Sequence, residues 1–370
     1  MATLVASTLM MPLKLSPANV SDGALSIRGA GISFALLEER SGTVYSRHGK
    51  TADMEQILAD SGANYARIRL WVNPPGGYFD LPAALELARR AKEAGLKIFL
   101  DLHYSDTWAD SKHQTTPAAW QTFDLPLLVR TVRDYTRDVI GQFARQDTPV
   151  DMVQIGNEVT NGMLWPVGQI YRETGEDWAS FVALLNAGIE GARQGDGTSR
   201  HLAVVIHYDD GGDNMGARYF FDHILAAGVT AFDAIGLSYY PFWHGALSKL
   251  QNNLDDLATR YKKKLIVAET AYPWKLQGGD PDLGFADVRK LPEGDAYPPT
   301  VAGQEQYFRA LRNVLLEVPF QRGVGLFVFG PGWLRVPWQP GAWNPWGNLA
   351  MFDPSGRTLP ALTVALAPPT

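Results

Sequence analysis

Residues 153–166 read VQIGNEVTNGMLWP, so an apolar run ends abruptly in Gly156, Asn157 and Glu158. A buried strand that presents an amide and a carboxylate at its last residues has little structural reason to do so. Residues 265–270, LIVAET, repeat the arrangement with Glu269. Because an α/β barrel places its chemistry at the carboxyl ends of its strands, the two stretches together favour that fold.

Apolar runs alternate with amphipathic segments along the rest of the chain, which is typical of repeated βα units. The predicted strands are residues 28–34, 66–72, 97–103, 152–158, 203–207, 234–238, 265–269 and 323–329. The predicted helices are residues 83–95, 125–144, 178–194, 216–227, 247–262 and 302–318. No Gly-rich phosphate loop follows the first strand, which disfavours a doubly wound sheet.

We therefore predict an α/β fold, a (β/α)8 TIM barrel that forms a single catalytic domain over residues 21–370, preceded by an N-terminal extension at residues 1–20. Two Pro- and Gly-rich tracts, residues 277–300 and 331–347, follow the last two predicted strands. Loops of this length inside a compact domain are usually functional. We expect them at the C-terminal face of the barrel.

The composition excludes several classes of protein. The chain has 370 residues, 46% of them apolar, and a net charge of −6 without any basic run, so nucleic acid is not an expected partner. It has no cysteine, which excludes disulfides and thiol nucleophiles. No apolar span is long enough for a membrane helix, and residues 1–12 lack the basic segment and cleavage site of an intact signal peptide.

The two strand-end carboxylates predict acid-assisted cleavage of a glycosidic bond. Glu158 would protonate the leaving oxygen as general acid and then act as base, and Glu269 would attack the anomeric carbon as nucleophile. Arg69 would orient Glu269 and keep it ionised. Asn157 would hold a sugar hydroxyl, and Tyr239 or Tyr240 would donate a hydrogen bond to Glu269. Structural roles in a helix cap or an ion pair are the alternatives for the two glutamates.

Other polar and aromatic side chains gather at the predicted strand ends and are candidates for substrate binding. They are His103, Asp106, Trp108, His207, Asp209, Trp243 and Trp274. Indole rings suit the apolar faces of sugars. His103 and His207 lack the spacing of metal ligands, so we expect them to form hydrogen bonds in the cleft. Asp280 and Asp282 are candidate ligands for a structural calcium ion, although the regular spacing of a calcium loop is absent.

Several of these strings resemble glycoside hydrolase family 53, the endo-β-1,4-galactanases. The resembling segments are residues 67–74, 101–110, 114–120, 153–166, 207–214, 235–245 and 267–274. The resemblance implies a retaining barrel enzyme that hydrolyses internal β-1,4-galactosidic bonds in galactan or type I arabinogalactan. It implies Glu158 as the acid/base and Glu269 as the nucleophile. It also implies a secreted, monomeric enzyme that acts on a polysaccharide and requires no cofactor.

The chain departs from the family pattern near the last predicted strand. Phe329 stands where the family has Trp, and Gly330 stands where it has Glu, ahead of Trp333. Phe329 and Trp333 remain candidates for stacking on sugar, although Phe lacks an N–H donor. Trp346-Gly347-Asn348 replaces a usual Trp-Glu-Asn. The alternatives are therefore a retaining barrel enzyme for another β-linked plant glycan, a non-catalytic carbohydrate-binding barrel and a metal-dependent barrel hydrolase.

Overall fold

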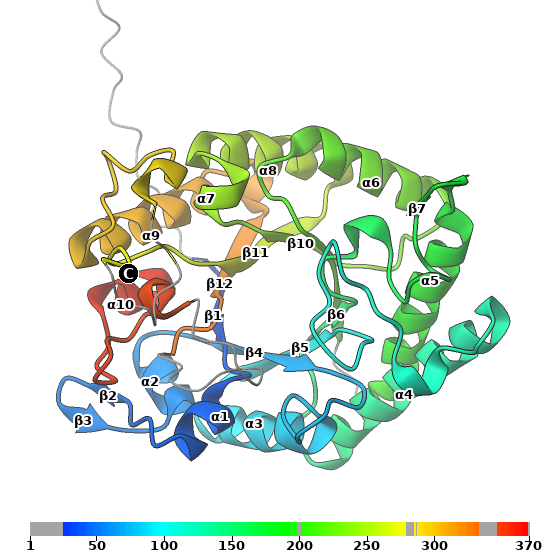
Figure 1. The fold of residues 1–370 in the computed structure, drawn as a ribbon, viewed down its shortest axis with the longest axis horizontal. Helices are drawn as coiled ribbons and strands as arrows, with labels where there is room; N and C mark the ends of the chain where they lie inside the picture. Colours follow the sequence, from blue (N-terminus) through cyan, green and yellow to red (C-terminus); the bar gives the residue numbers. More distant parts are fainter. Residues whose placement is uncertain (1–24, 198–200, 279–284, 286, 333–345, 369–370) are drawn as a thin grey trace, which may run out of the picture.

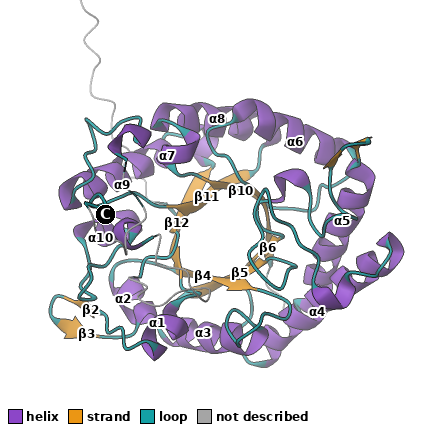
Figure 2. Ribbon diagram, in the orientation of Figure 1, coloured by secondary structure: helices purple, strands orange, loops and turns teal. Residues whose placement is uncertain are grey.

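Eight parallel strands close into a barrel, which confirms the predicted fold class. The computed structural model describes residues 25–197, 201–278, 285, 287–332 and 346–368. Figures 1 and 2 look into the ring of strands, which helices surround on the outside. In order around the barrel the strands are β1 (Ile27–Gly31), β12 (Gly323–Val328), β11 (Lys264–Thr270), β10 (Ala234–Ser238), β9 (Ala203–Tyr208), β6 (Met152–Ile155), β5 (Lys97–Leu102) and β4 (Tyr65–Leu70).

The helices predicted from apolar periodicity are all present. They are α3 (Leu81–Glu93), α4 (Leu125–Arg145), α5 (Trp178–Gly195), α6 (Asn214–Ala226), α8 (Leu247–Tyr261) and α9 (Val301–Leu316). Four shorter helices were not predicted: α1 (Ala35–Arg40), α2 (Met54–Asp60), α7 (Pro241–His244) and α10 (Pro360–Leu366). Two short hairpins were not predicted either, β2 (Ser46–Arg47) with β3 (Lys50–Thr51), and β7 (Tyr171–Arg172) with β8 (Gly175–Glu176).

Side chains cap most of the long helices at their N-termini. Asp80 accepts a hydrogen bond from the backbone amide of Ala83 at 2.9 Å, and a proline follows in the first turn of α3. Asp124 caps α4 in the same way, again followed by a proline. These caps satisfy amides that the first helical turn leaves without partners. They therefore fix where each βα loop ends and its helix begins.

The interior of the barrel consists of layers that follow the two-residue period of the strands. The lowest layer is an apolar plug made of Ile27, Tyr65, Phe99, Met152, Val205, Ala234, Ile266 and Phe327. Gly29 leaves room for the plug, because a Cβ atom there would lie 2.4 Å from the Phe327 ring. Two residues further along β4, β5, β6 and β9 lie the buried polar residues Arg67, Asp101, Gln154 and His207. The polar layer therefore rests directly on the plug.

The strand that carries Glu158 is shorter than predicted. β6 ends at Ile155 because Gly156 has a φ of +76° and Glu158 a φ of +48°, both in the left-handed region. A Cβ atom on Gly156 would lie 2.4 Å from Val159 Cγ1, so only glycine fits there. The sharp turn that follows, rather than the strand itself, presents Glu158 to the barrel mouth.

Some sequence predictions concern residues outside the described ranges. The N-terminal extension at residues 1–20 is one, and parts of the two predicted long loops are others. The described part of the first loop includes a 3₁₀ turn, Val288–Lys290. Among the helices that the structure describes, none combines the length and apolar character that crossing a membrane demands.

Candidate active site

A pocket of about 200 Å³ at the carboxyl ends of the strands brings the two predicted carboxylates together. Glu158 comes from the turn after β6 and Glu269 from β11. The pocket is lined by Arg69, His103, Trp108, Ala109, Asp110, Asn157, Glu158, Tyr240, Trp243, Glu269, Phe329 and Trp346. Of the thirteen other residues predicted for the site, seven line this pocket.

Glu269 is held as a carboxylate by two donors. Arg67 Nη1 donates to its Oε1 at 2.8 Å, and the Tyr240 hydroxyl donates to its Oε2 at 3.0 Å. Burial alone would raise the pKa of Glu269, but the positive charge of Arg67 overcomes this effect and holds the pKa below its ordinary value. Glu269 is therefore ionised and fixed in direction, as a nucleophile must be.

Glu158 has the opposite electrostatic surroundings. Burial, and then the negative charge of Glu269, raise the pKa of Glu158 well above its ordinary value. The opposing effect is a hydrogen bond with Ser238, whose hydroxyl lies 2.5 Å from Glu158 Oε1. Two carboxyl groups in one pocket whose pKa values are driven apart can divide the roles of acid and nucleophile.

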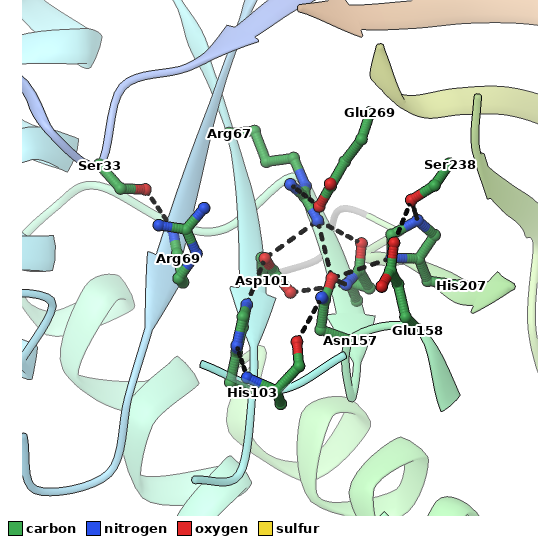
Figure 3. A network of polar contacts seen from close by, with 12 residues as sticks. Ser33, Arg67, Arg69, Asp101, His103, Asn157, Glu158, His207, Ser238 and Glu269 are labelled. Carbon is green, nitrogen blue, oxygen red and sulfur yellow. Dashed lines mark hydrogen bonds and ion pairs between the residues drawn. The ribbon is translucent and has the colours of Figure 1, made fainter. Parts of the chain in front are cut away.

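A chain of hydrogen bonds behind Glu158 agrees with a protonated acid (Figure 3). Arg67 and Gln154 donate to Asn157 Oδ1, which identifies this atom as the amide oxygen. His207 Nδ1 lies 3.0 Å from the same oxygen and therefore donates to it. Burial lowers the pKa of His207 to about 4, so the ring is neutral and its Nε2 must accept.

The group that faces His207 Nε2 is the Ser238 hydroxyl, at 3.1 Å. Ser238 has one proton, and both His207 Nε2 and an ionised Glu158 would require it. A proton on Glu158 resolves this conflict, because Glu158 then donates to Ser238 and Ser238 donates to His207. The network therefore accommodates the proton that burial and Glu269 favour on Glu158, and the Ser238 hydroxyl can turn to donate to Glu158 once that proton has left.

His103 is locked by a second set of contacts. The amide of Ala109 donates to its Nδ1 at 3.1 Å, so its Nε2 donates to Asp101 Oδ2, also at 3.1 Å. Burial opposes the ionisation of Asp101, but Arg67 and His103 outweigh it and hold the pKa of Asp101 below its usual range. Both ring nitrogens of His103, like those of His207, are thus occupied by protein groups.

Three candidates make other contacts than predicted, while Tyr240 donates to Glu269 as expected. Arg67, rather than Arg69, is the guanidinium that orients Glu269, because Arg67 lies one layer deeper in the barrel. The Tyr239 hydroxyl donates to the Gly245 carbonyl at 2.6 Å and takes no part in lining the pocket. Asp106 accepts the amides of Asn73 and Ala118, both at 2.9 Å, so its carboxylate joins two loops instead of binding substrate.

Aromatic side chains form the walls of the pocket. Trp108, Phe329 and Trp346 line it, and so does Trp243, which is 61% exposed. An adjoining cavity of about 540 Å³ shares Glu158, Tyr240 and Trp243 with the pocket and is also lined by Asp209. The two cavities together have enough volume for more than one sugar ring.

Trp274 differs from the other predicted tryptophans. Its indole N–H donates to the Gly347 carbonyl at 3.3 Å, and its ring packs against Ala350. It does not line the pocket that the described residues form. We therefore assign Trp274 to holding the chain around residues 346–350 in place.

Three candidates lie outside the described residues: Trp333, Asp280 and Asp282. Within the ranges that the structure does describe, no group of three or more His, Asp or Glu side chains is arranged to hold a metal ion. Sequence reasoning missed Arg67, Asp101, Gln154 and Ser238, and it also missed Ala109, Asp110 and Trp346, which line the pocket. The first four carry a usable signal, since each lies an even number of positions from another inward-facing residue of its strand.

Comparison with known proteins places this site in a family. The model of glycosyl hydrolase family 53 matches residues 27–365. A probable arabinogalactan endo-β-1,4-galactanase A of Aspergillus terreus is 41% identical over 324 residues, 85% of this chain and 88% of the relative. A solved structure of a fungal β-1,4-galactanase is 34% identical, with a TM-score of 0.82 over 93% of this chain and 99% of that one.

A second solved structure, the family 53 catalytic domain of Ignisphaera aggregans, is also 34% identical, with a TM-score of 0.85 over 96% of this chain and 99% of that one. The similarity covers nearly the whole barrel and every strand that contributes to the pocket. The chain therefore belongs to glycosyl hydrolase family 53.

Proposed function

We propose that this protein is a retaining endo-β-1,4-galactanase that cleaves internal bonds of galactan and type I arabinogalactan. The observation that carries the proposal is the pair Glu158 and Glu269, which share one pocket and have pKa values displaced in opposite directions. The names of the family 53 relatives support the choice of galactan as substrate.

The proposed reaction has two steps. In the first, Glu269 attacks the anomeric carbon while Glu158 gives its proton to the leaving glycosidic oxygen, so that a glycosyl–enzyme ester forms and the leaving chain departs. In the second, Glu158, now ionised, takes a proton from water, and the resulting hydroxide equivalent displaces Glu269. Arg67 and Tyr240 stabilise the carboxylate before the attack and after its release.

Product analysis on β-1,4-galactan tests this proposal. Proton NMR during the first minutes of hydrolysis should show β-configured reducing ends, and chromatography should show several oligosaccharide lengths at once. Initial α-configured products would contradict retention, and release of a single short product would contradict endo action. No release of reducing ends from galactan would refute the substrate.

Glu269→Ala serves as the matched inactive variant. It should lose turnover and still bind galacto-oligosaccharides, because the aromatic walls that contact sugar rings remain in place. Binding is measured by titration calorimetry. Turnover by Glu269→Ala at the wild-type rate would remove Glu269 from the role of nucleophile, whereas binding without turnover by the wild type would favour the alternative of a carbohydrate-binding barrel.

Phe329 favours a second candidate, a retaining enzyme for another β-linked plant glycan. Its ring lies 5.1 Å from that of Trp346 in the pocket wall, where it offers a stacking surface without an N–H donor. Parallel assays on galactan, mannan, xylan and cellulose separate the two candidates. The first requires that galactan be the fastest substrate.

We further propose that catalysis requires no metal or organic cofactor. Both ring nitrogens of His103 and of His207 are engaged by protein groups, and the two carboxyl groups suffice for the chemistry. Activity should be unchanged after dialysis against EDTA, and a loss that zinc or calcium restores would contradict this. We also propose a monomer that meets its polymeric substrate outside the cell, which light scattering and analysis of culture fluid can test.

A further inference from the structure

Arg69 is the basic residue that lines the pocket, and the proposed mechanism does not use it. It follows Arg67 by two positions on β4, so its side chain faces inward one layer nearer the mouth. Only 5% of the residue is exposed. Its guanidinium carbon lies 4.0 Å from the centroid of Trp108 and 5.5 Å from each of three phenylalanine rings, Phe34, Phe79 and Phe329.

The guanidinium of Arg69 lacks the partners that a buried cation normally has. Its Nε and Nη1 are buried and form no hydrogen bond within the described part of the chain, and no ion pair there includes it. In Figure 3 the dashed line at Arg69 runs from its backbone amide to the Ser33 hydroxyl, while its guanidinium stands apart from the network around Asp101. Arg67, by contrast, donates to Glu269, Gln154 and Asn157 and pairs with Asp101.

The surrounding rings do not satisfy these donors. A cation–π contact stabilises the charge through the face of the guanidinium, whereas its N–H bonds lie in the plane and require acceptors at the edge. Burial lowers the pKa of Arg69 to about 10, so the group is still a cation at neutral pH. The pocket thus contains a positive charge with free in-plane donors.

Among the described residues, no carboxylate forms an ion pair with Arg69. Gly330, next to Phe329, has a φ of +49°, and a Cβ atom there would meet nothing nearer than the Phe34 ring at 3.9 Å. The segment that follows, residues 333–345, contains no Asp or Glu in its sequence. Asp101 and Glu269 are the carboxylates that most raise the pKa of Arg69, and both are already paired with Arg67.

We propose that Arg69 binds the carboxylate of an acidic sugar in the substrate, so that the enzyme cleaves β-1,4-galactan segments bearing a uronate in preference to neutral ones. A planar guanidinium fork matches a carboxylate with two parallel hydrogen bonds. The aromatic rings beside it offer surfaces for the apolar face of the same sugar. This inference rests on the proposed function, because it specifies the glycan that the same pocket accepts.

Paired substrates test the inference with the wild-type enzyme alone. One is neutral β-1,4-galactan, and the other is the same polymer with a small fraction of its C6 hydroxymethyl groups oxidised to carboxylates. We expect kcat/KM per uronate-bearing segment to be about tenfold higher than per neutral segment, the change that one such charge-assisted contact corresponds to. Mass spectrometry of the products should place uronates at one fixed distance from the cleaved bond.

Four variants assign the preference to Arg69. Arg69→Gln should remove the preference, and Arg69→Lys should retain only part of it because an ammonium lacks the fork. Gly330→Glu should also remove it by supplying an internal carboxylate beside the same Phe34 ring. Gly330→Gln is the matched control, since it has the same size and the same backbone strain without the charge, and it should keep the preference.

Inhibition by small molecules gives a second readout that does not depend on the variants folding. Galacturonate should inhibit wild-type cleavage of neutral galactan at about tenfold lower concentration than galactose or acetate, which lack either the charge or the ring. Equal rates on both polymers together with equal inhibition would overturn the inference while the galactanase activity stands. Failure to cleave either polymer would instead refute the proposed function.

Discussion

Removing the hydroxyl of Tyr240 should change the pH dependence of the reaction in a defined direction. This hydroxyl donates to Glu269 Oε2 at 3.0 Å in a buried environment. A hydrogen bond to a charged group contributes about 1.5–3 kcal/mol, and one pKa unit corresponds to about 1.4 kcal/mol. Tyr240→Phe destabilises the ionised form of Glu269, so the pKa of Glu269 should rise by about 1–2 units.

The assay is the dependence of kcat/KM for soluble galactan on pH. Its acid limb reports the ionisation of the nucleophile in the free enzyme, measured as a property of the coupled carboxyl pair. The limb should therefore move to higher pH in Tyr240→Phe. Tyr239→Phe is the matched control, because the neighbouring hydroxyl donates to the Gly245 carbonyl away from the pocket.

Two results would refute this reasoning. An acid limb in Tyr240→Phe that coincides with that of the wild type would mean that the hydroxyl does not stabilise the ionised nucleophile. An equal displacement in Tyr239→Phe would mean that the effect arises from general loosening of the loop after β10. The stability of both variants, measured by urea denaturation, separates local from global changes.

Three further changes have expected outcomes. Ser238→Ala removes the hydrogen bond that lowers the pKa of Glu158, so the alkaline limb of kcat/KM should move up by about one pH unit or more; an unchanged limb contradicts the assignment of Glu158. Trp243→Ala, which deletes an exposed ring shared by both cavities, should raise KM about 2–10-fold with a smaller effect on kcat, and a reversed pattern argues against a binding role. Burial raises the pKa of Glu38 to about 7, so the folded state holds this proton more tightly than the unfolded chain, and stability falls as pH rises from about 4.5 to 7. In Glu38→Gln the loss of unfolding free energy with rising pH should be about 3 kcal/mol smaller. The urea midpoints at about pH 5 and about pH 7.5 should therefore differ less than in the wild type.

The sequence was sufficient for the barrel and its two carboxylates, because both depend on local patterns. Apolar runs of strand length alternate with amphipathic helices, and each glutamate directly follows such a run. The short helices escaped detection because six or seven residues span too few turns for a periodic signal. Nothing in the local pattern of residues 152–158 indicated that Gly156 would end its strand early.

The sequence did not predict contacts that depend on how deep a side chain lies inside the barrel. Arg67 and Arg69 face the same side of β4 by the two-residue period, and only the stagger between strands sets which of them reaches Glu269. Tyr239 and Tyr240 are adjacent, so their side chains leave the chain in different directions, and a register shift at the end of β10 decides which one enters the pocket. Ser238 was overlooked because a small hydroxyl carries no signal until its neighbours are placed.

The apolar plug and the polar layer above it consist of different residues, so stability and catalysis can be engineered separately. Buried charge pairs stabilise a fold poorly, because the desolvation of both ions offsets much of their attraction. The network around Arg67 and Asp101 therefore serves orientation, and the stability of the fold comes from apolar packing in the plug and in the larger core of strand and helix residues. Substitutions that improve packing among the plug residues can raise thermal tolerance with little effect on the pKa values of Glu158 and Glu269. Selection for heat resistance and selection for a new glycan can then proceed on different residues of the same strands.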